Sequence, residues 1–169
     1  TILSVGYSEQ NDLDQLAEFC KINFSEYLAD KKPYLNTNQI SKLIQQGFYF
    51  GSHSCDHPEY RFLTLNEQVR QTKVSTREIC NRFQLNYKTF AFPFTDYGVT
   101  QQFFDEVFQK ENILDLSFGC AGLKKDSVSR NVQRIPLEVS NLSAEEIIKS
   151  EYIYCIIKSF FGKNTIKRI

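Results

Sequence analysis

The sequence of 169 residues lacks methionine and tryptophan and contains only two histidines. Because metal binding and proton transfer near neutral pH often rely on imidazole, this scarcity restricts any catalytic proposal to very few residues. The absence of methionine extends to position 1. We therefore expect that the chain does not begin where translation began.

Long apolar runs and an excess of charge of one sign are also missing. No apolar stretch approaches the roughly 18 residues needed to span a bilayer, and no signal-peptide pattern opens the sequence. The 20 basic residues balance the 20 acidic ones, so no net field attracts the chain to nucleic acid or to a membrane, and we expect neither as a partner. The apolar fraction of 41% and the length are typical of one globular domain.

Paired cysteines are missing as well. The five cysteines are odd in number, widely spaced and without a C-x-x-C pair, which argues against a disulfide framework and against a zinc ribbon. Cys20, Cys80 and Cys155 lie in apolar stretches with helical spacing, so we expect them to be small buried side chains. This cysteine usage favours a reducing compartment such as the cytoplasm.

Helical patterns fill residues 1–46, and strand and helix patterns alternate in residues 47–169. This order predicts one α/β domain with a largely parallel sheet, preceded by an N-terminal helical segment. The expected strands are 48–50, 89–94, 113–118 and 132–137, and the main expected helices are 65–83, 99–109 and 144–161. Capping boxes are expected at Asn36–Gln39, Thr64–Glu67 and Ser143–Glu146. The basic tail, residues 163–169, is expected to lie on the surface.

The two histidines stand four residues apart in the segment His53-Ser54-Cys55-Asp56-His57. Gly51 precedes the pair and Pro58 follows it, so the segment reads as a loop after a strand rather than as a helix. In α/β folds, binding and catalytic sites commonly lie at the carboxyl ends of the strands, the rim of the sheet where this loop is expected. An ordinary surface turn would also account for the pattern, and a catalytic zinc usually needs a third protein ligand as well. Asp96, after the next strand, could reach the same rim.

The segment Gly51-Ser52-His53-Ser54-Cys55-Asp56-His57-Pro58 resembles the H-[ST]-x-x-H-P metal motif of the polysaccharide deacetylases, a carbohydrate esterase family. The similarity includes the lead-in QISKLIQQGFYFGSHS, the helix 65–83, the segment Phe90-Ala91-Phe92-Pro93-Phe94 as third motif, and Arg134-Ile135-Pro136 as late strand. It covers about residues 35–140.

The resemblance implies an incomplete, distorted (β/α) barrel of about four mostly parallel strands. It also implies a Zn²⁺ or other divalent ion that activates water to remove an N- or O-acetyl group from a glycan. His53 and His57 would be two metal ligands, and Ser54 would brace their loop through a hydrogen bond. An acetylated glycan is the expected partner. The loop that follows Pro93, with Phe94, Asp96 and Tyr97, is expected to contact it, although a turn over residues 95–98 explains this loop equally well.

Three departures from the family pattern limit this interpretation. The sequence contains no Asp-Asp pair, which the first motif uses as base and third ligand. The position where the third motif usually carries arginine is Ala91, and no histidine after His57 is present to act as the acid. The catalytic base and acid are therefore expected to be absent from this chain. A nucleophilic pairing of Cys55 with a histidine has no orienting third group.

Two hypotheses remain. The chain is the C-terminal part of a longer metal-dependent deacetylase, inactive or weak as an isolated fragment. Alternatively, it is a non-catalytic carbohydrate-binding or assembly module on a degenerate deacetylase scaffold. In either case the open edges of an incomplete barrel would favour self-association.

Overall fold

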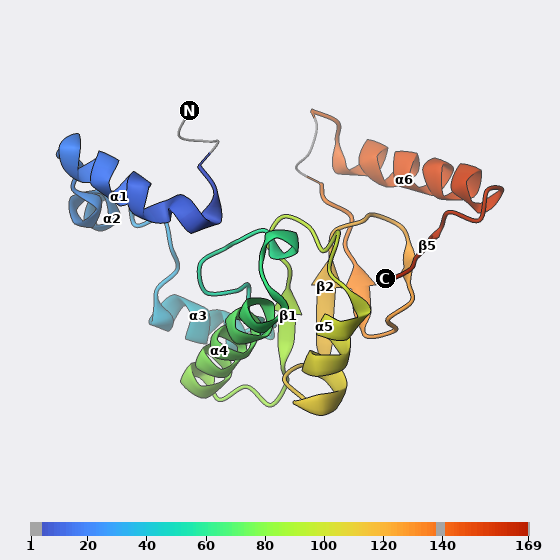
Figure 1. The fold of residues 1–169 in the computed structure, drawn as a ribbon, viewed down its shortest axis with the longest axis horizontal. Helices are drawn as coiled ribbons and strands as arrows, with labels where there is room; N and C mark the ends of the chain where they lie inside the picture. Colours follow the sequence, from blue (N-terminus) through green and yellow to red (C-terminus); the bar gives the residue numbers. More distant parts are fainter. Residues whose placement is uncertain (1–4, 138–140, 169) are drawn as a thin grey trace. The chain divides into compact units, whose positions relative to one another are not determined.

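The computed structural model describes residues 5–137 and 141–168 (Figure 1). The chain divides into two units, Thr1–Tyr49 and Phe50–Ile169. The described elements are six α-helices, several short 3₁₀ or π turns and two small parallel sheets.

The first unit is helical. It contains the 3₁₀ turn η2 (Tyr7–Glu9) and the helices α1 (Gln10–Phe19), α2 (Phe24–Lys31) and α3 (Thr37–Gln45). The capping box of Asn36 and Gln39 is present at the start of α3, as predicted. Cys20, the C-cap residue of α1, is exposed, so its expected burial was wrong, and Cys80 and Cys155 are only partly buried.

The helices of the second unit are η3 (Tyr60–Phe62), α4 (Leu65–Phe83), α5 (Gln101–Asp105) continued by the π-helical turn η4 (Glu106–Lys110), and α6 (Ala144–Ser159). Helix α4 has the bounds that the sequence predicted. Thr64 caps it, but the Glu67 carboxylate binds Arg70 instead of closing the capping box. The capping box of Ser143 and Glu146 is present at the start of α6. None of the described helices is long and apolar enough to cross a membrane.

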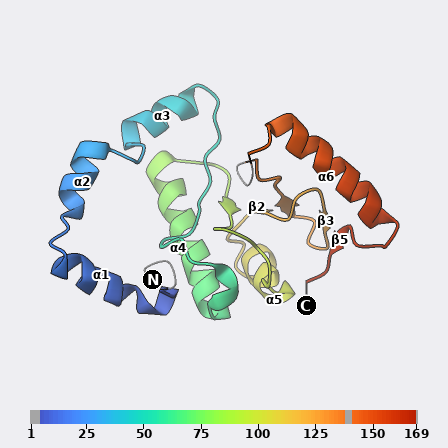
Figure 2. The same cartoon turned by 90° about the horizontal axis from the view of Figure 1, so that it is seen from above.

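The main sheet has three parallel strands in the order β1 (Thr89–Ala91), β2 (Leu116–Gly119), β4 (Asn131–Gln133). The strands are shorter than predicted, and residues 48–50 form none; only Ser52 makes an isolated parallel bridge to Phe90. Helices α4 and α6 lie at opposite ends of this unit with the sheets between them (Figures 1 and 2). Within the described residues the sheets do not close into a barrel.

Aromatic side chains form the core between α4, α5 and β1. Tyr60, Phe90, Phe92 and Phe103 are fully buried and meet edge to face, with ring centroids 5.0–5.9 Å apart. The Tyr60 hydroxyl shares a hydrogen bond of 3.0 Å with Thr72 of α4, and burial raises the pKa of this tyrosine. Truncation of such a ring typically costs about 3–5 kcal/mol, so this core fixes β1 and the loop that follows it.

The C-terminal tail is the largest departure from the expected fold. Its strand β5 (Thr165–Ile166) pairs in parallel with β3 (Lys125–Asp126), which the sequence did not indicate. The Arg168 side chain is almost fully buried against Asp96 and Asp126. The expectation that this tail lies on the surface was therefore wrong for Arg168, because two buried carboxylates require its positive charge, whereas Lys163, Thr165 and Lys167 are exposed.

Candidate functional site

The two histidines lie on a loop that is fixed to the end of β1. Ser52, just before the loop, donates its backbone N–H to Thr89 over 2.8 Å and accepts one from Ala91 over 2.9 Å. The Ser52 hydroxyl also shares a hydrogen bond of 2.7 Å with Thr76 of α4. The loop therefore starts from a point that both the sheet and α4 hold in place.

The rings of His53 and His57 meet edge to face, with centroids 4.8 Å apart. Their Nε2 atoms are 3.1 Å apart, and the Nδ1 of His53 lies 2.7 Å from the carbonyl oxygen of Ala91. Because a carbonyl oxygen only accepts, this Nδ1 carries the proton and the Nε2 of His53 keeps its lone pair. Two nitrogens bound to one tetrahedral zinc ion at about 2.0–2.1 Å lie about 3.3 Å apart. The pair therefore has the spacing of two ligands of one ion.

The surroundings of His53 favour its neutral form. Partial burial lowers the pKa of His53, and the hydrogen bond to Ala91 opposes this effect. The neighbouring His57 and the guanidinium of Arg134 lower the pKa further. Neutral imidazole is the form that binds metal ions.

The backbone of the loop is held in a sparsely populated conformation. Ser54 and His57 have φ values of 69° and 55°, in the left-handed region that side chains disfavour. The Ser54 hydroxyl accepts the backbone N–H of His57 over 2.9 Å, which confirms the predicted brace. Strain of this kind persists only where the surroundings fix it, and it is common at functional sites.

Gln71 of α4 clamps the middle of the loop, a role that no sequence pattern revealed. Its side chain is fully buried, and its Oε1 accepts the backbone N–H groups of Cys55 and Asp56 over 2.9 and 3.3 Å. Its Nε2 donates to the Asp56 carboxylate over 2.6 Å. Asp56 is thus turned towards α4. Burial first, and the charge of Asp56 next, raise the pKa of the Cys55 thiol.

The loop after Pro93 places Phe94, one of the residues expected to contact a glycan, next to the histidines. The Phe94 ring packs edge-on against His57 with centroids 4.7 Å apart, and its φ of 53° is also left-handed. Phe94 and Tyr97 are 65% and 71% exposed, so both can touch a ligand.

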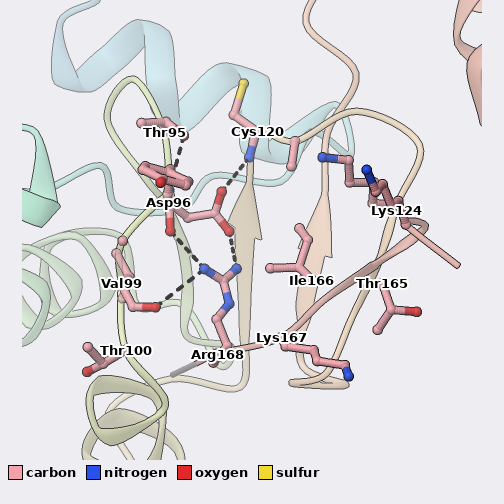
Figure 3. A pocket seen from close by; sticks show the side chains of 14 residues that line it. Thr95, Asp96, Val99, Thr100, Cys120, Lys124, Thr165, Ile166, Lys167 and Arg168 are labelled. Carbon is pink, nitrogen blue, oxygen red and sulfur yellow. Dashed lines mark hydrogen bonds and ion pairs between the residues drawn. The ribbon is translucent and has the colours of Figure 1, made fainter. Parts of the chain in front are cut away.

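Asp96, from the same loop, is placed differently. It is 2% exposed, and its carboxylate accepts hydrogen bonds from Asn131 over 2.9 Å and from Gln133 over 2.8 Å. The same carboxylate pairs with Arg168 (Figure 3). In this arrangement the Asp96 carboxylate holds the loop from inside and is not exposed to a ligand, whereas Phe94 and Tyr97 are exposed.

The family model for polysaccharide deacetylases matches residues 14–105 of the chain, more than half of its length. The chain belongs to the polysaccharide deacetylase family. The match begins before the expected residue 35 and ends at residue 105, short of the expected residue 140. It includes both the histidine loop and the loop after Pro93, whereas the expected late strand Arg134-Ile135-Pro136 lies outside the match and after the end of β4. No curated protein and no solved structure matches the chain.

The described residues of this deacetylase-family chain offer two candidate metal ligands, His53 and His57, rather than a full set. Across residues 5–137 and 141–168, no group of three or more His, Cys, Asp or Glu side chains lies close enough together to hold a metal ion. Asp56 and Asp96, the two carboxylates that the sequence places nearest, are engaged by Gln71 and Arg168. The two imidazoles therefore fit a metal ion, but no third protein ligand for it is assigned among the described residues.

Arg134 adds a positive charge to this rim of the deacetylase scaffold. Its Nε donates to the Gly119 carbonyl over 2.9 Å and its Nη2 to the Phe92 carbonyl over 3.0 Å, so the guanidinium is fixed across the ends of the strands. The usual arginine position of the third motif is Ala91 here. Arg134 follows β4, and only the pairing of β4 with β2 brings it to the site.

Proposed function

We propose that the rim formed by the histidine loop and the loop after Pro93 binds an acetylated glycan beside a divalent metal ion, Zn²⁺ or another, held by His53 and His57. The observation that supports this most is the 3.1 Å separation of the two Nε2 atoms, with the Nδ1 of His53 fixed on a carbonyl. Membership of the deacetylase family supports the class of substrate.

Each residue has a role that follows from its placement. His53 and His57 bind the ion, which when bound supplies Lewis acidity to water and to an acetyl carbonyl. Ser54 and Gln71 hold the loop so that both Nε2 atoms converge. Phe94 and Tyr97 offer exposed ring faces to sugar rings.

Hydrolysis requires more than these residues provide. A third protein ligand holds a catalytic zinc in place, and a base and an acid move the protons. The described residues hold no group that would add a third ligand to the two histidines, and we assign no base and no acid among them. We therefore propose that the chain by itself binds metal and glycan weakly and releases little or no acetate.

A second candidate function is glycan binding without catalysis. The engagement of both nearby carboxylates inside the protein favours it, because neither is available as a base. The two functions differ in one product: only the deacetylase forms acetate.

The test measures glycan binding and acetate release in parallel. The chain is incubated with Zn²⁺ and N-acetylated chitooligosaccharides, alongside a His53→Ala/His57→Ala variant and a Phe94→Ala/Tyr97→Ala variant. We expect measurable binding by the wild type, weaker binding by the aromatic variant and acetate at background level. Equal binding by the wild type and the aromatic variant would contradict the assigned surface, and rapid acetate release lost in the histidine variant would contradict the proposed inactivity.

A further inference from the structure

A pocket of about 680 Å³ is lined in part by the loop that carries Tyr97. Its walls come from the segments 95–100, 120–124 and 163–168, all within the second unit (Figure 3). The volume is within the usual range for small-molecule sites. Neither histidine lines it, so it is distinct from the candidate metal site.

Among the described residues that line the pocket, Asp96 is the only one with a side-chain carboxylate, and its charge is already neutralised. Asp96 pairs with Arg168, which also pairs with Asp126 behind the wall. Amide groups of Asn131 and Gln133 donate to both carboxylates over 2.8–3.0 Å. The negative charge of Asp96 is thus directed inwards and does not oppose an anion in the pocket.

Three lysines also line the pocket. Within the part of the chain that the structure describes, Lys124, Lys163 and Lys167 form no ion pair with a carboxylate. The whole chain has a net charge of zero, so this excess of positive charge is local. It raises the local concentration of anionic ligands.

Lys124 is the least solvated of the three. Its burial lowers its pKa, and the nearby ammonium group of Lys158 lowers it further, while Tyr154 and Glu151 compensate in part. A bound anion would relieve this repulsion between two cations, which is the usual effect of an opposite charge on such a group.

The rim adds features that suit a sugar. Tyr97 lines the pocket and is 71% exposed, and the hydroxyls of Thr95 and Thr165 lie in the same lining. An exposed aromatic ring covers an apolar sugar face, and hydroxyls exchange hydrogen bonds with sugar hydroxyls. Tyr97 stands three residues after Phe94, so a ligand in the pocket is one loop away from the histidine pair.

We propose that this pocket binds the carboxylate of an acidic sugar, so that the glycan presented to His53 and His57 carries both acetyl groups and negative charge. The proposal rests on the proposed function for the choice of a glycan. The charge of the pocket is independent of the metal site.

Two tetrasaccharide probes distinguish this proposal from general sugar binding. One alternates glucuronate with N-acetylglucosamine, and the other contains N-acetylglucosamine alone. Both are titrated into the isotope-labelled full chain in EDTA, with backbone amide shifts as the readout, so the result does not depend on metal binding or activity. We expect the acidic probe to bind at least about fivefold more tightly at low salt, to shift amides around the pocket, and to lose this advantage as salt rises.

Matched variants assign the effect to the pocket. Lys124→Gln/Lys167→Gln should bring the acidic probe to within about twofold of the neutral one, whereas Lys31→Gln/Lys149→Gln removes the same charge outside the pocket and should change nothing. Tyr97→Ala should weaken both probes. Amide spectra of each variant report whether it is folded.

Several outcomes would overturn the proposal: equal binding of the two probes, no binding of either, equal effects of the two lysine pairs, or inorganic phosphate binding as tightly as the acidic probe. The last result would indicate a general anion site. The His53→Ala/His57→Ala variant tells the two proposals apart. Its zinc binding tests the proposed function, whereas its preference for the acidic probe tests the pocket and should be unchanged.

Discussion

Arg168 and Asp96, 72 residues apart in the sequence, form an ion pair in which their side chains are 3% and 2% exposed. Arg168 also donates to the backbone carbonyl of Asp96 over 2.8 Å, and its guanidinium lies 4.9 Å from the centre of the Phe104 ring. One side chain from the tail therefore fixes the loop that carries Phe94 and Tyr97 to the rest of the sheet.

Replacement of Arg168 should destabilise the protein strongly. Arg168→Ala leaves Asp96 and Asp126 buried without their cation, a change that typically costs about 3–5 kcal/mol. Urea unfolding measures the loss, and Lys167→Ala, an exposed neighbour, should stay within about 0.5 kcal/mol of the wild type. A fully stable Arg168→Ala protein would show that the tail is not anchored in this way.

The stability should fall in acid because of Asp96. Burial alone would raise the pKa of Asp96, but hydrogen bonds from Gln133 and Arg168 and the charge of Arg168 outweigh burial and hold this pKa below its usual value. A carboxyl with a lowered folded pKa contributes stability that is complete above its unfolded pKa of about 3.9 and is lost as pH falls through the folded pKa.

Urea midpoints between pH 6 and pH 3 test this relation. We expect the wild type to lose stability mainly below about pH 4. Asp96→Asn should be less stable at pH 6 and should lose less between pH 5 and pH 3. If the urea midpoints of the two proteins fall in parallel with pH, Asp96 does not contribute to the loss of stability in acid.

The clamp of Gln71 on the histidine loop should be measurable. Gln71→Ala leaves the N–H groups of Cys55 and Asp56 without their acceptor and should cost about 1–3 kcal/mol of unfolding free energy. It should also weaken zinc binding, because the loop loses its support. Gln109→Ala, in an exposed helical position, is the control and should change neither quantity. Unchanged zinc affinity in Gln71→Ala would argue against a positioning role.

The left-handed backbone at Phe94 makes a paired comparison possible. Phe94→Ala and Phe94→Gly both remove the ring that packs on His57, but only glycine adopts a φ of 53° without steric cost. Phe94→Gly should therefore be about 1 kcal/mol more stable than Phe94→Ala in thermal or urea unfolding. If alanine is the more stable of the two, the loop does not hold this conformation.

The sequence predicted best the features that depend on near neighbours. Helix α4 has the expected bounds because the signal that starts it, the cap at Thr64, is local, although the residues it buries are polar. The Ser54 brace is a three-residue hydrogen bond and follows from the loop sequence in the same way. The family motif placed His53 and His57 together, as the structure does.

Features that depend on distant pairing were not predictable in this way. Residues 48–50 have the composition of a strand, yet the described sheet offers a partner only to Ser52. The burial of Arg168 depends on β5 pairing with β3, two strands of two residues each, which leave no periodic pattern in the sequence. Asp96 lies in a turn-like loop, and its role became apparent only from the side chains that surround it.

The central claim is that His53 and His57 bind one divalent ion together. Calorimetric titration of the full chain with Zn²⁺ tests it most directly, with His53→Ala/His57→Ala as the variant and Cys55→Ser as a control for binding by the intervening thiol. We expect one ion per wild-type chain, bound weakly but at least about tenfold more tightly than by the histidine variant, and unchanged binding by Cys55→Ser. Equal affinity of the wild type and the histidine variant would contradict the claim.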